Sequence, residues 1–320
     1  MAAASIVAAA LLAGGCGKDA GRGTAASGRP GVVATVLPVY VLALDAAGEK
    51  PGVELSLLLP AGAGCPHDYT LSPGDAARLA RARLLLAVGA GFEPFLAPET
   101  LARVNRDLAV VDLSEGLKLI PREHEGAGHG ADEGKAGGEA HQHHAGAWNG
   151  HTFASPRNAA RMTRRIAEAL AGVDPAGAAG YRANAEASAR ELEALADELA
   201  AAAKTFPNRK VVATHDVLAY LARDAGLEVV AVIEDEPGEE PGLGVFARLV
   251  ERVRAEKPAA IFSEPQYPDK PAWALSRETG VPVHSLDPFA SGRAERGAYL
   301  AAMRGNLATL KKALGPKGAP

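Results

Sequence analysis

The sequence predicts an α/β fold of two Rossmann-like lobes, each with a four-stranded, mainly parallel sheet, joined by one long rigid α-helix. Short apolar runs alternate along the chain with segments of helical periodicity, and the runs fall into two sets of four. Most runs are continuously apolar, as in strands that a parallel sheet buries on both faces. A long Ala-, Glu- and Leu-rich segment without proline separates the two sets. The chain of 320 residues also exceeds one comfortable core, which favours two domains.

The predicted strands define an N-terminal lobe, residues 32–172, and a C-terminal lobe, residues 207–315. Segments between strands, such as Gly74–Ala82 and Leu243–Glu256, carry apolar residues at helical spacing, and repeated β–α units imply right-handed crossovers. The predicted strands are Val32–Leu37, Val53–Leu59, Leu84–Val88, Leu108–Leu113, Lys210–Thr214, Glu228–Ile233, Ala259–Ser263 and Val281–Leu286.

Residues 1–15 are interpreted as a signal peptide, because residues 2–15 are apolar or small, uncharged, and soon followed by a polar stretch. Cys16 comes directly after them, and this arrangement resembles the lipobox of bacterial lipoproteins, in which that cysteine is lipidated. We therefore expect lipidation at Cys16 and a flexible tether over residues 16–31. The expected location is extracytoplasmic, either periplasmic or anchored to the membrane as a lipoprotein. A plain signal peptide is the alternative.

Two segments of different character separate the two sets of strands. Residues 122–147 are rich in His, Gly, Glu and Ala, cannot bury a core and form a predicted loop. Clustered imidazoles and carboxylates bind transition metals weakly, so we expect low-affinity metal binding there. Residues 173–206 form the predicted linking helix. Its proline-free part, from Ala176 to Thr205, is about 45 Å long at about 1.5 Å per residue. The loop histidines are His124, His129, His141, His143 and His144.

Composition and missing motifs exclude several classes of function. The formal net charge of −4 gives no sign of the basic face that a nucleic-acid binder needs, so no nucleic-acid partner is expected. The sequence contains neither a phosphate-binding glycine loop nor a Gly-x-Ser-x-Gly nucleophile motif. No apolar run reaches the roughly 20 residues of a membrane-spanning helix.

Three single histidines and one aspartate are the candidate metal ligands: His67, His151, His215 and Asp287. Each lies at or after the carboxyl end of a predicted strand, where open α/β sheets bind ligands, and two come from each half of the chain. Three imidazoles and one carboxylate suit a borderline divalent ion such as Zn²⁺. Glu264 ends another predicted strand, and is either an alternative fourth ligand or a group that orients a ligand from outside.

At these residues the chain resembles the metal-specific solute-binding lipoproteins of bacterial ABC importers, the cluster A-I zinc and manganese binders, and especially their zinc-uptake type. The resemblance implies two lobes joined by a long helix, with metal between them. It implies ligands at His67, His151, His215 and Asp287, and associates a His-rich loop with zinc. The segments that carry it are Cys65–Thr70, Asn149–Pro156, Ala213–Tyr220, Ile261–Gln266 and Leu286–Pro288.

The resulting expectation is a zinc-binding component of an ABC metal importer that captures Zn²⁺ between its lobes and delivers it to a membrane permease driven by a separate ATPase. The protein is expected to be a monomer, tethered to the membrane by its lipid, and not an enzyme. The nearest alternative is a manganese-specific protein of the same family, with Mn²⁺ as the cargo. Further alternatives are a zinc metallohydrolase, with Glu264 as general base, and an adhesin or metal buffer.

Overall fold

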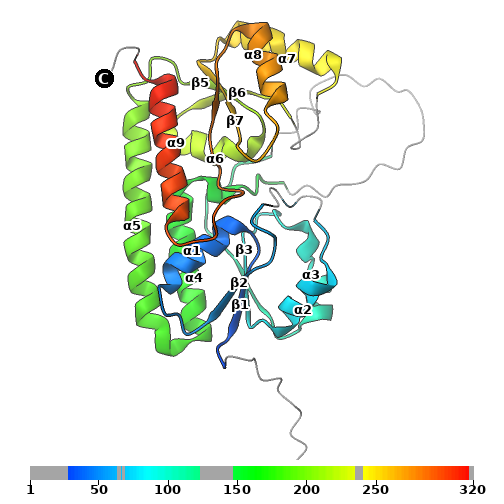
Figure 1. The fold of residues 1–320 in the computed structure, drawn as a ribbon, viewed down its shortest axis with the longest axis vertical. Coiled ribbons are helices and arrows are strands. Elements are labelled where there is room, and N and C mark those ends of the chain that lie inside the picture. Colours follow the sequence, from blue (N-terminus) through cyan, green and yellow to red (C-terminus); the bar gives the residue numbers. More distant parts are fainter. Residues whose placement is uncertain (1–27, 63–65, 67–68, 123–146, 235–240, 317–320) are drawn as a thin grey trace, which may run out of the picture.

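The computed structural model describes residues 28–62, 66, 69–122, 147–234 and 241–316 (Figure 1). It contains two four-stranded sheets, in which every neighbouring pair of strands is parallel. The predicted fold class is therefore confirmed. Each predicted strand is present, shorter than predicted by one to three residues.

The N-terminal lobe is built on the sheet order β2-β1-β3-β4. Its helices cover the sheet, and α2 begins with a capping box in which Ser72 and Asp75 bond each other's backbone N–H. The strands are β1 (Gly31–Ala34), β2 (Glu54–Leu57), β3 (Leu84–Ala87) and β4 (Ala109–Asp112), and the helices are α1 (Leu37–Ala47), α2 (Pro73–Arg81), the 3₁₀ turn η1 (Pro94–Leu96) and α3 (Pro98–Val104).

The C-terminal lobe repeats this topology with the order β6-β5-β7-β8. Its first strand, β5, is central and leads into the 3₁₀ turn η5, so the residues after β5 lie at the middle of the sheet's carboxyl edge. The strands are β5 (Lys210–Ala213), β6 (Glu228–Val232), β7 (Ala260–Ser263) and β8 (Val283–Ser285), and the helices are η5 (Asp216–Leu218), α6 (Ala219–Ala225), α7 (Leu243–Glu256), α8 (Lys270–Thr279) and α9 (Ala298–Leu314).

A helical layer runs along both lobes. After η3 (Thr152–Ala154), α4 (Pro156–Val173) and the turn η4 (Pro175–Gly177) lead into α5 (Ala178–Ala203), which is the predicted linking helix. Its 26 residues span about 39 Å at about 1.5 Å per residue, and an Ala- and Leu-rich face is buried. Arg164 of α4 binds two carboxylates of α5, those of Glu186 and Glu193, which fastens the pair side by side.

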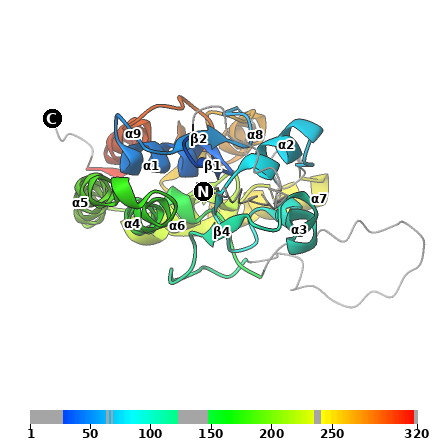
Figure 2. The same ribbon diagram turned by 90° about the horizontal axis from the view of Figure 1, so that it is seen from below.

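The C-terminal helix α9 lies beside α5 and also reaches the N-terminal lobe (Figures 1 and 2). The Gly297 N–H before it donates to Asp45 of α1, and the buried Tyr299 hydroxyl donates to the carbonyl of Phe153 in η3. One buried apolar core includes residues of both sheets, such as Leu85 and Phe262, together with α5 and α9. Two helices and a shared core therefore connect the lobes.

The carboxyl ends of the two sheets face the region between the lobes (Figure 1), and His215, Glu264 and Asp287 follow strands of the C-terminal sheet at that edge. Among the described residues, no helix combines the length and the apolar character needed to cross a membrane.

Candidate metal centre

Part of the predicted ligand set falls on residues that the structure describes, namely His151, His215, Asp287 and Glu264. His67, Cys16 and the five histidines of the 122–147 loop lie outside the described residues.

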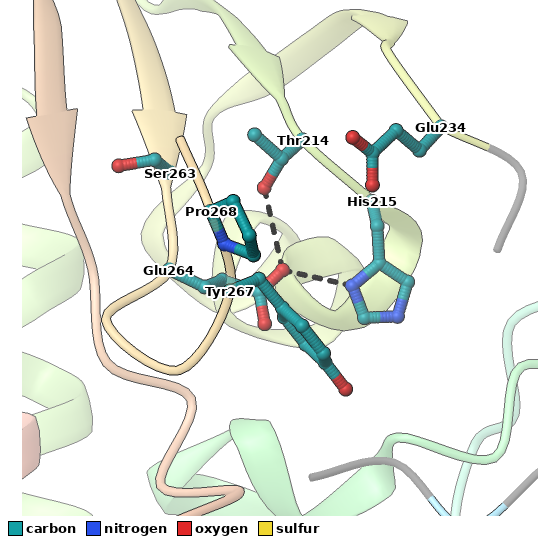
Figure 3. Close-up of a pocket in the computed structure, with 7 residues that line it drawn as sticks. All are labelled: Thr214, His215, Glu234, Ser263, Glu264, Tyr267 and Pro268. Atoms are coloured by element: carbon teal, nitrogen blue, oxygen red, sulfur yellow. Dashed lines mark hydrogen bonds and ion pairs between the residues drawn. The ribbon is translucent and has the colours of Figure 1, made fainter. Parts of the chain in front are cut away.

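His215 comes two residues after β5, and its ring is buried. Strands β5 and β7 are paired neighbours, so Glu264, directly after β7, lies beside it. The Glu264 Oε1 atom is 2.8 Å from His215 Nδ1 and also accepts from Thr214 Oγ1 at 3.3 Å (Figure 3). Gln266 Nε2 donates to the other carboxylate oxygen at 2.6 Å. This surrounds a buried carboxylate with donors and places it on one ring nitrogen of His215.

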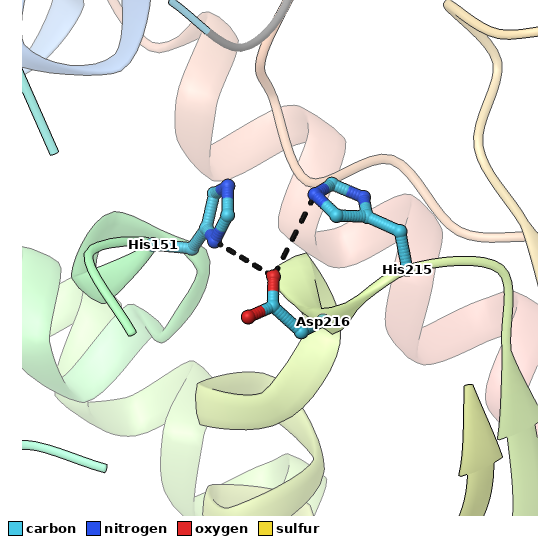
Figure 4. A group of neighbouring side chains, drawn as sticks. All are labelled: His151, His215 and Asp216. Atoms are coloured by element: carbon cyan, nitrogen blue, oxygen red, sulfur yellow. Dashed lines mark ion pairs between the residues drawn. The ribbon is translucent and has the colours of Figure 1, made fainter. Parts of the chain in front are cut away.

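His151 approaches from the segment that precedes η3 and α4. Its ring is buried, packs edge-on against Phe92 with centroids 5.1 Å apart, and faces the ring of His215 at 5.0 Å. Two oxygens lie near its Nδ1, Asn149 Oδ1 at 3.1 Å and Asp216 Oδ1 at 3.2 Å (Figure 4). The two imidazoles therefore meet at the boundary between the lobes.

The acceptors around these rings determine which nitrogen donates to a metal. An oxygen that only accepts requires an N–H opposite it, so Nδ1 of both His151 and His215 carries the proton. The lone pair of each neutral ring is then on Nε2. A carboxylate or amide oxygen on the far nitrogen is the usual way in which proteins orient an imidazole ligand. The carboxylate of Glu264 thus supports the orienting role that the sequence offered as one alternative.

Asp216 lies in the same cluster as the two histidines, although the sequence analysis assigned it no role. Its Oδ1 lies between the two rings, 3.2 Å from His151 Nδ1 and 3.7 Å from His215 Nε2. Burial alone raises the pKa of this carboxyl, but the His151 and His215 rings, when they are protonated in the metal-free protein, outweigh it and the pKa is lowered. One ligand atom from each of His151, His215 and Asp216 fits within a sphere of metal-site size. The position of Asp216 directly after His215, near the end of a strand, is the sequence signal that could have identified it.

Asp287 follows β8 on the same edge of the C-terminal sheet. Asn306 of α9 holds its backbone by accepting from its N–H and donating to its carbonyl, and the Phe289 N–H donates to the side chain at 2.7 Å. Burial, together with the charge of Glu264, raises the pKa of the Asp287 carboxyl. A cation nearby would offset this cost, so the carboxylate is suited to bind one.

The stem of the 122–147 loop lies next to this centre. Pro121 and Trp148 form an antiparallel bridge, and the Asn149 N–H donates to the Ile120 carbonyl at 2.9 Å. The two described ends of the loop are therefore held together two residues before His151.

Comparison with known proteins agrees with this architecture. The family model described as zinc-uptake complex component A, periplasmic, matches residues 32–313. The high-affinity zinc uptake system protein ZnuA of Brucella abortus (strain 2308) is 28% identical over 319 residues, covering 88% of this chain and 89% of that protein.

Solved structures show the same fold. The SBP FpvC of Pseudomonas aeruginosa, in complex with Ni²⁺, superposes with a TM-score of 0.75 at 27% identity, covering 91% of this chain and 99% of the other. The same protein in complex with Mn²⁺ gives 0.73 at 28% identity, with 89% and 98% covered. A zinc-bound deletion mutant of ZnuA gives 0.73 at 26% identity, with 90% and 99% covered.

The match covers most of the chain, and it separates the solute-binding class of function from the enzyme class. Such proteins bind a solute rather than transform it, so the metallohydrolase alternative is excluded. The chain belongs to the family of the periplasmic zinc-uptake complex component A, and is a metal-binding component of an ABC importer rather than an enzyme.

Proposed function

We propose that the protein captures Zn²⁺ between its lobes and delivers it to the permease of an ABC importer that a separate ATPase drives. The observation that carries this proposal is the buried pair of imidazoles, His151 and His215, whose ring centroids are 5.0 Å apart. Both rings have Nδ1 engaged by oxygen acceptors, which makes Nε2 the donor atom for a borderline ion.

The proposed ligands are His67, His151, His215 and Asp287. Glu264 orients His215, and Asp216 holds His151 while lying beside the donor nitrogen of His215. Three neutral imidazoles and one carboxylate bind zinc with a net charge of +1, and four protein ligands leave no position for a reactive water.

The 122–147 loop is proposed to collect ions weakly and to pass them to the buried site, next to which its stem lies. Cys16 is the proposed lipid anchor, which would hold the monomeric protein at the membrane beside its permease.

Specificity is the finer part of the proposal. Mn²⁺ prefers oxygen ligands, whereas the described donors that meet here include two imidazoles, which favours zinc over manganese. Nickel also accepts imidazole, and FpvC has been solved with Ni²⁺ and with Mn²⁺. Competition between Zn²⁺, Mn²⁺ and Ni²⁺ is therefore part of the test.

The test is a titration of metal-stripped protein with each ion, in the wild type and in a variant lacking residues 123–147. We expect one tight zinc site that survives the deletion, weaker sites that disappear with the loop, and much weaker binding of Mn²⁺. A tight site that disappears with the loop would place the metal outside the cleft and refute the proposal. Tighter binding of Mn²⁺ or Ni²⁺ than of Zn²⁺ would refute the specificity alone.

A further inference from the structure

The segment that carries His151 is hydrogen-bonded to the C-terminal lobe by contacts that the proposed ligand set does not include. We call these contacts the interlobe latch. They connect Lys118, Ile120 and Asn149 on one side with Asp216, Tyr220 and Arg223 on the other.

Tyr220 of α6 lies at the centre of the latch, and its side chain is 0% exposed. Its hydroxyl accepts from the Ile120 N–H at 3.1 Å and donates to the Asn149 carbonyl at 2.7 Å. Burial raises the pKa of Tyr220, so the hydroxyl stays protonated and keeps donating. One oxygen thus binds both strands of the loop stem to α6.

Asn149 connects the latch to the metal site through its side-chain amide. Its Nδ2 donates to the Asp216 carbonyl at 2.8 Å, and its Oδ1 accepts from the His151 backbone N–H at 2.9 Å and lies 3.1 Å from His151 Nδ1. The same buried residue therefore contacts Tyr220 through its carbonyl, and His151 and Asp216 through its amide.

A second set of contacts secures α6 from the outside. The Arg223 guanidinium lies 5.0 Å from the centroid of the Tyr220 ring and donates to the Lys118 carbonyl at 2.7 Å. Asp224 accepts a hydrogen bond from Ser155, the N-cap residue of α4. The chain on both sides of His151 is thereby fixed to one short helix of the opposite lobe.

We propose that Tyr220 is a positioning residue for metal capture: through Asn149 its hydroxyl holds His151 at a fixed place against His215 across the boundary between the lobes. The inference rests on the proposed metal site and adds the element that sets its geometry. A ligand displaced by a fraction of an ångström binds metal less well, and contacts outside the ligand set are typically worth about 10- to 100-fold in affinity.

The experiment compares Tyr220→Phe with a matched control, Tyr181→Phe. Tyr181 of α5 is also buried, and its hydroxyl likewise accepts from a backbone N–H, that of Gly52 at 3.0 Å, and donates to an acceptor, Asp174. It lies at the far end of the N-terminal lobe, so its loss removes equivalent bonds away from the metal. Zinc affinity is measured by competition with a chromophoric chelator, the thermal midpoint is measured without metal, and the visible spectrum is recorded with Co²⁺.

We expect both variants to lose stability, and only Tyr220→Phe to lower zinc affinity, by about tenfold, and to change the Co²⁺ spectrum. Wild-type affinity and spectrum in Tyr220→Phe would overturn the positioning role, as would an equal loss of affinity in both variants. If Tyr220→Phe does not fold, Arg223→Gln replaces it: weaker zinc binding supports the latch, and unchanged binding overturns it. Failure of the wild type itself to bind zinc would instead refute the proposed function.

Discussion

The Nδ1 atom of His215 lies 2.8 Å from the Oε1 atom of Glu264, and the two side chains are only 2% and 1% exposed. A buried carboxylate in this position keeps the proton on Nδ1 and aims Nε2 away from the sheet. The two residues follow β5 and β7. Because these strands are parallel neighbours, their carboxyl ends bring the two side chains together.

Removing the charge of Glu264 should weaken zinc binding without abolishing it. Glu264→Gln keeps an oxygen that accepts from His215 but loses the charge that makes the ring a stronger donor, so we expect about tenfold lower affinity. Glu264→Ala, which leaves His215 without this orienting group, should lose about 100-fold. Chelator competition measures both. Equal affinities of the two variants and the wild type would show that Glu264 does not orient the ligand.

A pair of isosteric variants distinguishes the roles of Asp287, at the carboxyl edge of the C-terminal sheet, and Asp216, which lies between the two imidazoles. Asp287→Asn replaces the proposed ligand, whereas Asp216→Asn changes the group that holds His151. We expect the larger loss of zinc affinity in Asp287→Asn, because Asn306 holds the backbone of Asp287 at the sheet edge and the Phe289 N–H holds its carboxylate. Calorimetric titration of both variants measures the difference. A larger loss in Asp216→Asn would assign the carboxylate ligand to Asp216.

Glu93 should make the metal-free protein less stable as the pH rises. Burial raises its pKa from 4.5 to about 7, although Thr35 and the Val88 and Gly89 N–H groups bond the carboxylate. The folded state holds the Glu93 proton more tightly than the unfolded state does. The contribution of this proton to the free energy of unfolding is therefore complete below about pH 4.5 and is lost as the pH passes about 7. The difference amounts to about 3 kcal/mol.

Urea unfolding of the wild type and of Glu93→Gln, at pH 4.5 and pH 8 in the presence of a chelator, measures this contribution. The variant keeps the other titrating groups, so the wild type should lose more free energy of unfolding than the variant over this range. Parallel pH profiles of the two proteins would contradict the raised pKa.

Loading with zinc should leave the overall shape of the protein nearly unchanged. Helices α5 and α9, a common apolar core and the interlobe latch all connect the two lobes, so a wide opening would break many buried contacts at once. Small-angle scattering of metal-stripped and zinc-loaded protein should give closely similar profiles. A clear compaction on loading would show that the lobes separate in spite of these connections.

The sequence predicted the strands well because a parallel sheet buries continuous apolar runs. It overestimated their length for the same reason: Val36 and Leu37 are buried like the residues of β1, yet they are the N-cap and the first residue of α1. An apolar pattern reports burial and not strand pairing. The path of α9 along both lobes was likewise not predictable, since its apolar stripe is compatible with packing against either lobe.

The site was only partly predictable from sequence. His151 and His215 stand out as single histidines near strand ends, and the structure brings them together. In the sequence, Asp216 cannot be told apart from an ordinary surface charge. In the structure it begins the turn η5, and its carboxylate lies between the two imidazole rings. Asn149 and Tyr220 are 71 residues apart and have no special spacing, so only the folded chain shows that they meet.

The most direct test of the central claim is a crystal structure of the zinc-loaded protein with an anomalous difference map at the zinc absorption edge. The account predicts one strong peak between the lobes, about 2.0–2.1 Å from Nε2 of both His151 and His215. A zinc-loaded crystal without a peak within bonding distance of these two atoms would contradict it.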